Sequence, residues 1–498
     1  MNRWSVALTL LAPVLSGCNP PSPTRAQPPT GDAAAPRPGA FVVPSAHPQA
    51  SVVIEGVPHI KQKPDFCGEA CVEMALRKLG HPLDQDEVFN RSGLDPAQGR
   101  GVATAELKIA LERVGFDPGA VWSTVSASAP APGLEAAFQA LHDDLARGIL
   151  SIVCMHFDDR VDTTEHFRLI VGYDAARDEV LYQEPAEDEG GYRRMPRGSF
   201  LRLWPLPRSQ EAWSLIRLRL EPRALDSLAR PSPRQGFSPA DYAQHVLALR
   251  ARIGPGFTVR VEPPFVVVGD LPAAAMAHQT EDTVRWAVTK LKQDFFTSDP
   301  ASLLDVWLFK SSSSYEKNTL AIFGERPTTP YGFYSPSHKA LIMNISTGGG
   351  TLVHEIVHPF VEANFPECPA WFNEGLGSLY EQAGEEGGHI HGYPNWRLPG
   401  LQRAVLAGQV PSFRALTKTT TQEFYNEDPG SNYGQARYLC YYLQEQGLLV
   451  RFYKDFHARV TEDPTGFAAL KRVLGTEDMD AFKKRWETWV LGLSFPER

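Results

Sequence analysis

Thr351–Gln382 reads TLVHEIVHPFVEANFPECPAWFNEGLGSLYEQ, with two histidines four positions apart and a glutamate sixteen residues after the second histidine. Residues four apart lie one above the other on a helix face, so His354 and His358 can reach the same ion. A catalytic zinc ion takes three protein ligands and keeps its fourth position open for water. Glu374 is placed to be the third ligand, and the segment therefore predicts a zinc site.

Two apolar helices are expected to hold this site. The first follows the glycines at 348–350 and carries the histidine pair, while the second carries Glu374. Pro359 removes a backbone donor and should kink the first helix. Glu355 lies beside the ligands, where we expect a general base for a zinc-bound water whose pKa falls toward about 7. A purely structural histidine pair is the alternative, which this helical context disfavours.

These residues resemble the gluzincin metallopeptidases, in which HExxH precedes a helix whose W-x-N-E-G-like sequence holds the third ligand. The likeness covers residues 238–498 and implies zinc-dependent hydrolysis of peptide bonds in a two-lobed domain, with a mixed sheet followed by helices. It also implies that the strand predicted at 339–346 lies at the edge of the cleft. An extended peptide substrate could pair with that strand through main-chain hydrogen bonds.

Hydrolysis passes through a tetrahedral oxyanion, so a second hydrogen-bond donor facing the metal is expected. Gluzincin aminopeptidases use a tyrosine on a helix after the third ligand, and this resemblance favours Tyr433, which begins an apolar helical pattern. Tyr425, His389 and His391 are alternatives, and Tyr433 could instead serve only in packing.

Residues 1–18, MNRWSVALTLLAPVLSGC, have the basic residue, short apolar run and small residues of an export signal. Leu15-Ser16-Gly17-Cys18 resembles the lipobox of bacterial lipoproteins, which implies a lipid on Cys18 and a membrane anchor. An ordinary secretory signal is the alternative. Asn19 is not the aspartate associated with inner-membrane retention, so the resemblance favours the outer membrane.

Composition predicts a tether near the N-terminus, argues against nucleic acid as a partner and indicates a free thiol. Residues 19–50 are rich in proline and poor in large apolar groups, which predicts a semi-rigid tether. A net charge of -9 without a basic block argues against nucleic acid. The five cysteines beyond Cys18 are an odd number, so at least one free thiol is expected.

A second candidate site lies in the first half of the chain. Cys67 stands where a helix begins, a position that lowers a thiol pKa and favours a nucleophile. His166 opens an apolar run that predicts a strand, followed by a second strand ending at Glu184. If the hairpin is symmetric about Ala176, Glu184 lies opposite Arg168 and can orient His166.

These features resemble the papain-like cysteine peptidases that process bacteriocin leaders. The resemblance covers residues 52–220 and assigns Cys67, His166 and Glu184 to the catalytic group, with Gln62 in the oxyanion hole. Glu184 stands where that family has aspartate, so this longer side chain must retract. A non-catalytic peptide-binding or wall-binding version of the fold is the alternative; a metal pair formed by Cys67 and Cys71 is weaker, because no further ligands accompany it.

The sequence thus predicts an α+β protein in which two catalytic domains follow a lipid anchor, acting on a peptide or protein substrate. Because the junction is rich in Pro, Arg and Ser, we expect the two sites to act independently. The competing hypotheses are a metallopeptidase with a binding domain and a non-enzymatic surface protein. The expected divisions are a signal peptide (1–18), tether (19–50), cysteine-peptidase-like domain (51–222), linker (223–237) and zinc domain (238–498).

Overall fold

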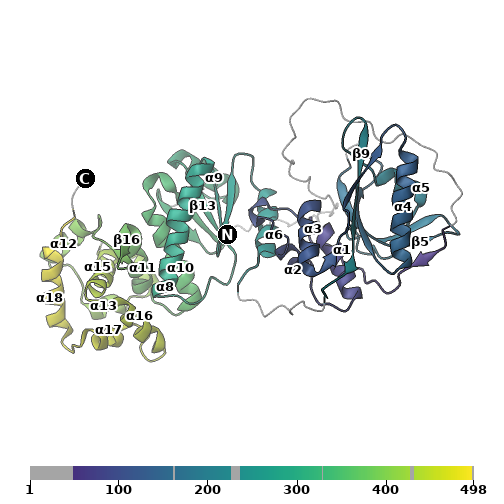
Figure 1. The fold of residues 1–498 in the computed structure, drawn as a ribbon. Helices are drawn as coiled ribbons and strands as arrows, with labels where there is room; N and C mark the ends of the chain where they lie inside the picture. Colours follow the sequence, from purple (N-terminus) through teal and green to yellow (C-terminus); the bar gives the residue numbers. More distant parts are fainter. Residues whose placement is uncertain (1–48, 161–162, 226–235, 328, 427–430, 496–498) are drawn as a thin grey trace, which may run out of the picture.

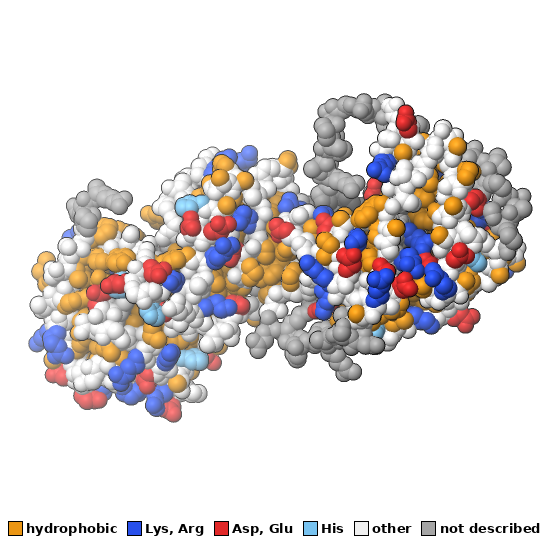
Figure 2. Space-filling model, viewed as in Figure 1, with side chains coloured by type: hydrophobic (Ala, Val, Ile, Leu, Met, Phe, Trp, Pro, Cys, Tyr) orange, Lys and Arg blue, Asp and Glu red, His pale blue; other side chains and the backbone are white. Residues whose placement is uncertain are grey.

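A computed structural model describes residues 49–160, 163–225, 236–327, 329–426 and 431–495. The predicted signal peptide, Cys18, nearly all of the tether and most of the predicted linker lie outside the described residues. Within the described residues, no helix has the length and apolar character needed to span a membrane. Figure 1 shows two units, each built around its own sheet, and Figure 2 shows acidic and basic side chains side by side on the viewed face.

The first unit is α+β, with an antiparallel sheet in the order β3-β9-β4-β5-β6-β7, extended by β1 on β5 and by β8 on β9. The strands are β1 (Val52–Val53), β3 (Trp122–Ser126), β4 (Ser151–His156), β5 (Glu165–Asp174), β6 (Glu179–Gln183), β7 (Arg193–Pro196), β8 (Leu206–Pro207) and β9 (Ala212–Arg219). Apolar runs predict strands at 149–155, 166–173, 179–184 and 213–220, and the structure confirms these strands within one or two residues.

Alternating side chains of β4 and β5 build two cores, one on each face of this sheet. Phe167, Leu169 and Val171 face one core, whereas Ile170 and Tyr173 face the other. A period of two is the pattern of a strand buried on both faces. A β-bulge between Ile170 and Gly172 interrupts this period in β5, so Tyr173 faces the second core. The first face is covered by α1 (Cys67–Lys78), α2 (Gln85–Asn90) and α3 (Thr104–Val114), and the second by α4 (Pro130–Ala146) and α5 (Arg197–Leu203).

Three short elements complete the first unit. The 3-10 turn η1 (Pro96–Gln98) lies between α2 and α3, and β2 (Phe116–Asp117) pairs with β10 (Glu221–Pro222).

The second unit begins with a five-stranded mixed sheet in the order β11-β12-β13-β15-β14. The strands are β11 (Thr258–Glu262), β12 (Phe265–Gly269), β13 (Leu304–Phe309), β14 (Gly332–Ser335) and β15 (Ala340–Asn344). β15 pairs with β13 on one side and with β14 on the other, so the expectation that it forms the edge was wrong. The edge strand is β14, whose four residues are too short for a clear periodic signal.

Helices cover both faces of this sheet and then form the rest of the second unit. The sequence pattern of residues 273–296 predicts one helix, and the structure divides it into α7 (Ala273–His278), a π-helical segment η3 (Gln279–Arg285) and α8 (Trp286–Asp294). The others are α9 (Ser312–Phe323), the 3-10 turn η4 (Ile345–Thr347), α10 (Gly350–Asn364), α11 (Ala370–Leu379), the 3-10 turn η5 (Tyr380–Gln382), α12 (Leu398–Leu406), α13 (Phe413–Thr417), α14 (Thr421–Asn426), α15 (Asn432–Glu445), α16 (Leu449–Ala458), α17 (Phe467–Leu474) and α18 (Met479–Gly492).

A small hairpin of β16 (Ala383–Glu386) and β17 (His389–Gly392) interrupts this helical part and was not predicted. Pro359 lies inside α10, which continues past it to Asn364.

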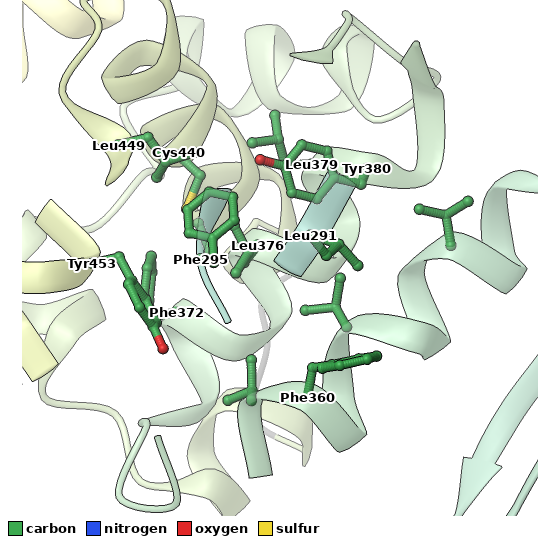
Figure 3. Packing of buried hydrophobic residues seen from close by; sticks show 14 of the residues in the cluster. Leu291, Phe295, Phe360, Phe372, Leu376, Leu379, Tyr380, Cys440, Leu449 and Tyr453 are labelled. Carbon is green, nitrogen blue, oxygen red and sulfur yellow. The ribbon is translucent and has the colours of Figure 1, made fainter. Parts of the chain in front are cut away.

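The helices that carry the histidine pair and Glu374 are anchored in the largest core. Figure 3 shows this packing, in which Phe360 of α10 and Leu376 of α11 lie near Leu291 of α8 and Cys440 of α15. All four side chains are fully buried. Because packed interiors resist displacement, this core fixes where α10 and α11 stand relative to each other.

One helix, α6 (Pro239–Arg250), packs against both units, and Figure 1 shows it between them. Ala240 and Ala243 lie in a core of the first unit, whereas Tyr242, Val246 and Leu249 lie in a core of the second. Ser238, followed by Pro239 and Asp241, predicts a capped helix start, and the structure confirms the capping box between Ser238 and Asp241. Three hydrogen bonds tie α6 to the first unit: Ala240 N to Asn90 Oδ1 (2.9 Å), Gln244 Nε2 to Pro64 O (2.9 Å) and Arg250 Nη2 to Ala97 O (2.9 Å).

Candidate functional site

α10 and α11 bring together the three predicted zinc ligands. The rings of His354 and His358 lie 4.9 Å apart on one face of α10. His354 Nε2 is 3.2 Å from Glu374 Oε2, and His358 Nε2 is 3.9 Å from Glu374 Oε1. Both Nε2 atoms therefore face one carboxylate, an arrangement that the i, i+4 spacing and the Asn373-Glu374-Gly375 sequence anticipated.

The Nδ1 atoms of the two histidines face other partners. His358 Nδ1 is 3.0 Å from Asn373 Oδ1, and His354 Nδ1 is 3.2 Å from Glu381 Oε1. The hydrogen bond to Asn373 fixes the His358 tautomer, whereas His354 Nδ1 faces Glu381 at ion-pair distance without a hydrogen bond among the described residues. Both arrangements leave Nε2 as the atom that can bind metal. A Cβ on Gly377 would come within 3.2 Å of the His354 ring, so this position of α11 favours glycine.

The donor set carries buried negative charge. Burial raises the pKa of Glu374, but hydrogen bonding to His354 and the charges of both histidines outweigh it and lower the pKa to about 2. Burial also opposes ionisation of Glu381, yet His354 and Arg397 lower its pKa to about 2. Two imidazole nitrogens, a carboxylate and surplus negative charge fit a divalent zinc ion.

Glu355 lies beside these ligands, with Oε2 at 3.9 Å from His358 Nε2. The backbone N–H of Tyr334, on the edge strand β14, donates a 2.9 Å hydrogen bond to the same oxygen. Burial is the main influence on Glu355 and raises its pKa. The carboxylate is thus oriented by the strand that forms the edge of the sheet, a contact that sequence analysis missed.

Tyr425, one of the alternative donors, contacts a predicted ligand directly. Its hydroxyl donates a 2.5 Å hydrogen bond to Glu374 Oε1, and burial followed by the Glu374 charge raises its pKa. The ring of Tyr433 packs 6.3 Å from that of Tyr425 and contacts the Arg397 guanidinium at 5.1 Å. The described contacts therefore favour Tyr425 as the hydroxyl at the ligands.

The two histidine alternatives have partners outside the ligand cluster. His389 Nδ1 is 2.5 Å from Asp294 Oδ1, and His391 Nε2 is 3.2 Å from Glu445 Oε1.

The second candidate site is centred on His166 and Glu184 of the first unit. Leu169 pairs with Gln183 across β5 and β6, so the register continues to Glu184 opposite Arg168, as predicted. The assumed symmetry about Ala176 was wrong near the turn, where Asp174 pairs with Glu179, and a β-bulge between Ile170 and Gly172 restores the predicted register. Glu184 Oε1 is 2.5 Å from His166 Nε2, and Arg168 Nε donates a 2.6 Å hydrogen bond to Oε2. Burial opposes ionisation of Glu184, but the bond to His166 lowers its pKa to about 2.

Cys67 and Gln62 lie at the same place. Cys67 begins α1, and the backbone of Phe167, the neighbour of His166, lies close enough to lower the pKa of this thiol, although burial outweighs it. The Gln62 N–H donates a 2.9 Å hydrogen bond to the carbonyl oxygen of Pro185, which follows Glu184. Within the described part of the chain, the buried Gln62 Oε1 has no hydrogen-bond partner. The fold thus joins His166 to Glu184 and brings the segments that carry Gln62 and Cys67 to neighbouring positions.

The expected lowering of the Cys67 pKa was wrong. Burial raises the pKa of this thiol to about 12, and the nearby carboxylates of Glu69 and Asp65 act in the same direction. Burial also raises the pKa of Glu69 to about 8. Desolvation and these acidic neighbours outweigh the position at the start of a helix.

Comparison with known proteins bears on the first unit. Residues 54–212 match the Peptidase_C39 like family, a range that includes Gln62, Cys67, His166 and Glu184. This match supports a peptidase-type first unit. No match to a curated protein was found. A solved structure titled "Structure of EndoMS-dsDNA2 complex" is 14% identical and covers 42% of this chain and 98% of its own, but its TM-score of 0.10 carries no argument about the fold.

Sequence analysis missed two arginines that support the candidate sites. Arg168 holds Glu184, and Arg397 holds Glu381, the partner of His354. No local spacing connects Arg397 with the ligands, because it follows the unpredicted hairpin. The position of Arg168 opposite Glu184 was expected, but its hydrogen bond to the Glu184 carboxylate was not, because an arginine within a strand pattern does not indicate its partner.

Proposed function

We propose that this protein is an envelope lipoprotein with peptidase activity, in which the second unit is a gluzincin-type zinc peptidase. The observation that carries the proposal is the convergence of His354 Nε2, His358 Nε2 and the Glu374 carboxylate between two buried helices. A five-stranded sheet followed by helices is also the order expected for the two lobes of a gluzincin domain.

His354, His358 and Glu374 would hold the zinc ion, which supplies a ligated water of lowered pKa and polarises the substrate carbonyl when bound. Glu355 would accept the proton of that water at its carboxylate, which the Tyr334 N–H orients. Tyr425 is the preferred donor to the developing oxyanion, because its hydroxyl already lies on Glu374. Tyr433 remains the competing assignment.

An extended peptide is the substrate that this unit fits best. β14 pairs with β15 along one side and forms one end of the sheet. On its other side the N–H groups of Gly332 and Tyr334 bond Thr329 and Glu355, so a peptide backbone would pair there through the Tyr334 carbonyl oxygen. The same strand supplies the N–H that holds Glu355. A peptide added to β14 would therefore run past the proposed base.

In the first unit, we infer that Cys67 acts as nucleophile and His166 as its base. Glu184 binds His166 Nε2, which leaves Nδ1 to take the thiol proton, and Gln62 would donate to the oxyanion. A second candidate function for this unit is peptide or cell-wall binding without catalysis. The raised pKa of Cys67 favours that candidate, because it keeps the thiol protonated.

The lipid anchor is proposed from the sequence around Cys18. Cys18→Ser should release the protein from the membrane fraction or leave an unprocessed precursor, measured by fractionation and gel mobility. A variant that fractionates and migrates like wild type would show that Cys18 carries no lipid.

The proposed activities can be tested on one preparation. Zinc content of the purified protein is measured together with hydrolysis of a mixed peptide library, with and without a chelator or a thiol reagent. Zinc near one equivalent and chelator-sensitive cleavage are expected. Protein that retains no zinc and cleaves no peptide would favour the non-enzymatic surface protein.

A further inference from the structure

A buried carboxylate lies behind the zinc-ligand candidate His354, on the side away from Glu374. Glu381, in η5, places Oε1 3.2 Å from His354 Nδ1, and its side chain is 13% exposed. Glu381 follows Glu374 by seven residues, in the turn that directly continues α11. His354 therefore stands between two carboxylates, one facing each ring nitrogen.

Glu381 is itself held on both oxygens. Arg397 Nη2 donates to Oε1 at 2.7 Å and Arg397 Nε donates to Oε2 at 3.1 Å, which is the bidentate geometry of an arginine–carboxylate pair. Asn395 Nδ2 adds a 2.9 Å hydrogen bond to Oε2. With both oxygens engaged, the carboxylate has little freedom to rotate away from the histidine.

The arginine is held in turn by two aromatic rings. Its guanidinium carbon lies 4.2 Å from the centroid of the Trp396 ring and 5.1 Å from that of Tyr433. The backbone N–H of Arg397 also donates a 3.1 Å hydrogen bond to Asn395 Oδ1. This bond links the two residues that donate to Glu381. Cation–π contact and a planar fork restrict this side chain in a way that lysine could not reproduce.

We propose that Glu381, fixed by Arg397, is a positioning residue that sets the tautomer and ring orientation of His354 for metal binding. It keeps a proton on Nδ1 and directs Nε2 toward the ion, which strengthens the affinity for zinc without contact between Glu381 and the metal. This inference rests on the proposed zinc site. It also gives Tyr433 a role through its ring, as a surface for Arg397.

The test compares zinc affinity in Glu381→Gln and Arg397→Lys with that of wild type. Both variants keep the approximate volume, but the first removes the charge and the second removes the bidentate fork. Glu385→Gln is the matched control, since Glu385 lies four residues further on and pairs with Lys290 at the surface, with 48% of its side chain exposed. Zinc dissociation constants come from competition with a chromophoric chelator, and the melting temperature of the metal-free protein is recorded for each variant.

Glu381→Gln is expected to weaken zinc binding by about 10–100-fold, and Arg397→Lys by about tenfold, while Glu385→Gln has no effect. The metal-free melting temperatures should change far less than the affinities. The visible spectrum of the cobalt-substituted protein should also shift in Glu381→Gln, because the orientation of His354 changes.

Wild-type zinc affinity in Glu381→Gln would overturn the inference while leaving the proposed zinc site intact. A loss of affinity that only follows a loss of metal-free stability would overturn it too, because Glu381 would then be structural. If Glu381→Gln does not fold, Arg397→Lys decides by the same criteria. Wild-type protein that binds no zinc would overturn the proposed function and the inference together.

Discussion

The two candidate sites use the same support behind a histidine but differ in what the histidine faces. In the first unit, His166 binds Glu184, which Arg168 holds while stacking near Phe157 (5.3 Å) and Tyr182 (5.4 Å). In the second unit, His354 approaches Glu381, which Arg397 holds while contacting Trp396 and Tyr433. In each arrangement a carboxylate contacts one ring nitrogen of the histidine and leaves the other nitrogen to bind metal or to accept a proton.

The neighbours of the remaining nitrogen decide that chemistry. In the second unit they are a second histidine and Glu374, a set that suits a divalent cation. In the first unit the proposed neighbour is the thiol of Cys67, which begins the helix α1 that packs against β5, the strand of His166. A shared histidine–glutamate–arginine support therefore does not define a function. The function depends on the residue types around the histidine nitrogen that does not contact the glutamate.

The largest expected effect separates metal binding from proton transfer in the second unit. Glu374→Ala should lose zinc, whereas Glu355→Gln should keep zinc near one equivalent and lower turnover by about a thousandfold or more. Metal analysis and peptide hydrolysis measure the two quantities. The reverse pattern of zinc retention would exchange the roles of these glutamates.

Cys67→Ala tests whether the first unit has its own catalytic chemistry. It should abolish hydrolysis that is sensitive to thiol reagents while sparing chelator-sensitive hydrolysis. Because burial raises the Cys67 pKa to about 12, iodoacetamide should label this thiol slowly at pH 7, with a rate that rises roughly tenfold per pH unit toward pH 10. Mass spectrometry of the labelled peptide follows the rate.

Three outcomes would change this view of Cys67 and of the independence of the two sites. A labelling rate that is already at a plateau near pH 7 would show a thiolate stabilised by His166. Wild-type protein without thiol-dependent activity would favour the binding-domain alternative. Loss of chelator-sensitive hydrolysis in Cys67→Ala would show that the two sites are coupled, for which α6 is the shared element.

A smaller effect distinguishes the two tyrosines of the second unit. Tyr425→Phe should lower turnover by roughly a hundredfold with zinc content unchanged, as expected for a donor used mainly in the transition state. Tyr433→Phe keeps the ring on Arg397 and should stay within a few-fold of wild type. The opposite ranking in steady-state kinetics would restore the assignment made from the sequence.

The smallest predicted effect concerns stability of the first unit in acid. The Glu184 pKa is about 2 in the folded protein against an ordinary 4.5, so its contribution is present above about pH 4.5 and is lost as pH falls toward 2. Glu184→Gln should remove roughly 2 kcal/mol of the pH dependence of stability between pH 7 and pH 3. Hydrogen exchange of β5 and β6 amides between pH 7 and 3 measures it.

The matched control for this experiment is Glu187→Gln, whose carboxylate pairs with Arg193 at the surface, with 43% of its side chain exposed. An unchanged pH dependence in Glu184→Gln would mean that the His166–Glu184 pair does not stabilise the fold.

Local sequence patterns predicted most of the elements and the pairs that one element or one hairpin brings together. The i, i+4 histidines of α10, the capped start of α6 and the strands at His166 and Glu184 follow from periodicity, because neighbours in sequence remain neighbours in a helix or hairpin. The α+β class followed from the same patterns.

Only the tertiary structure decided which distant side chains complete each site. Tyr425 on Glu374, the Tyr334 N–H on Glu355 and Arg397 on Glu381 join segments that no spacing rule connects. Burial, which arises only when all the elements pack, also reversed the expected shift of the Cys67 pKa. The sequence determined the residue types and the elements that carry them, while packing determined their partners and their charge states.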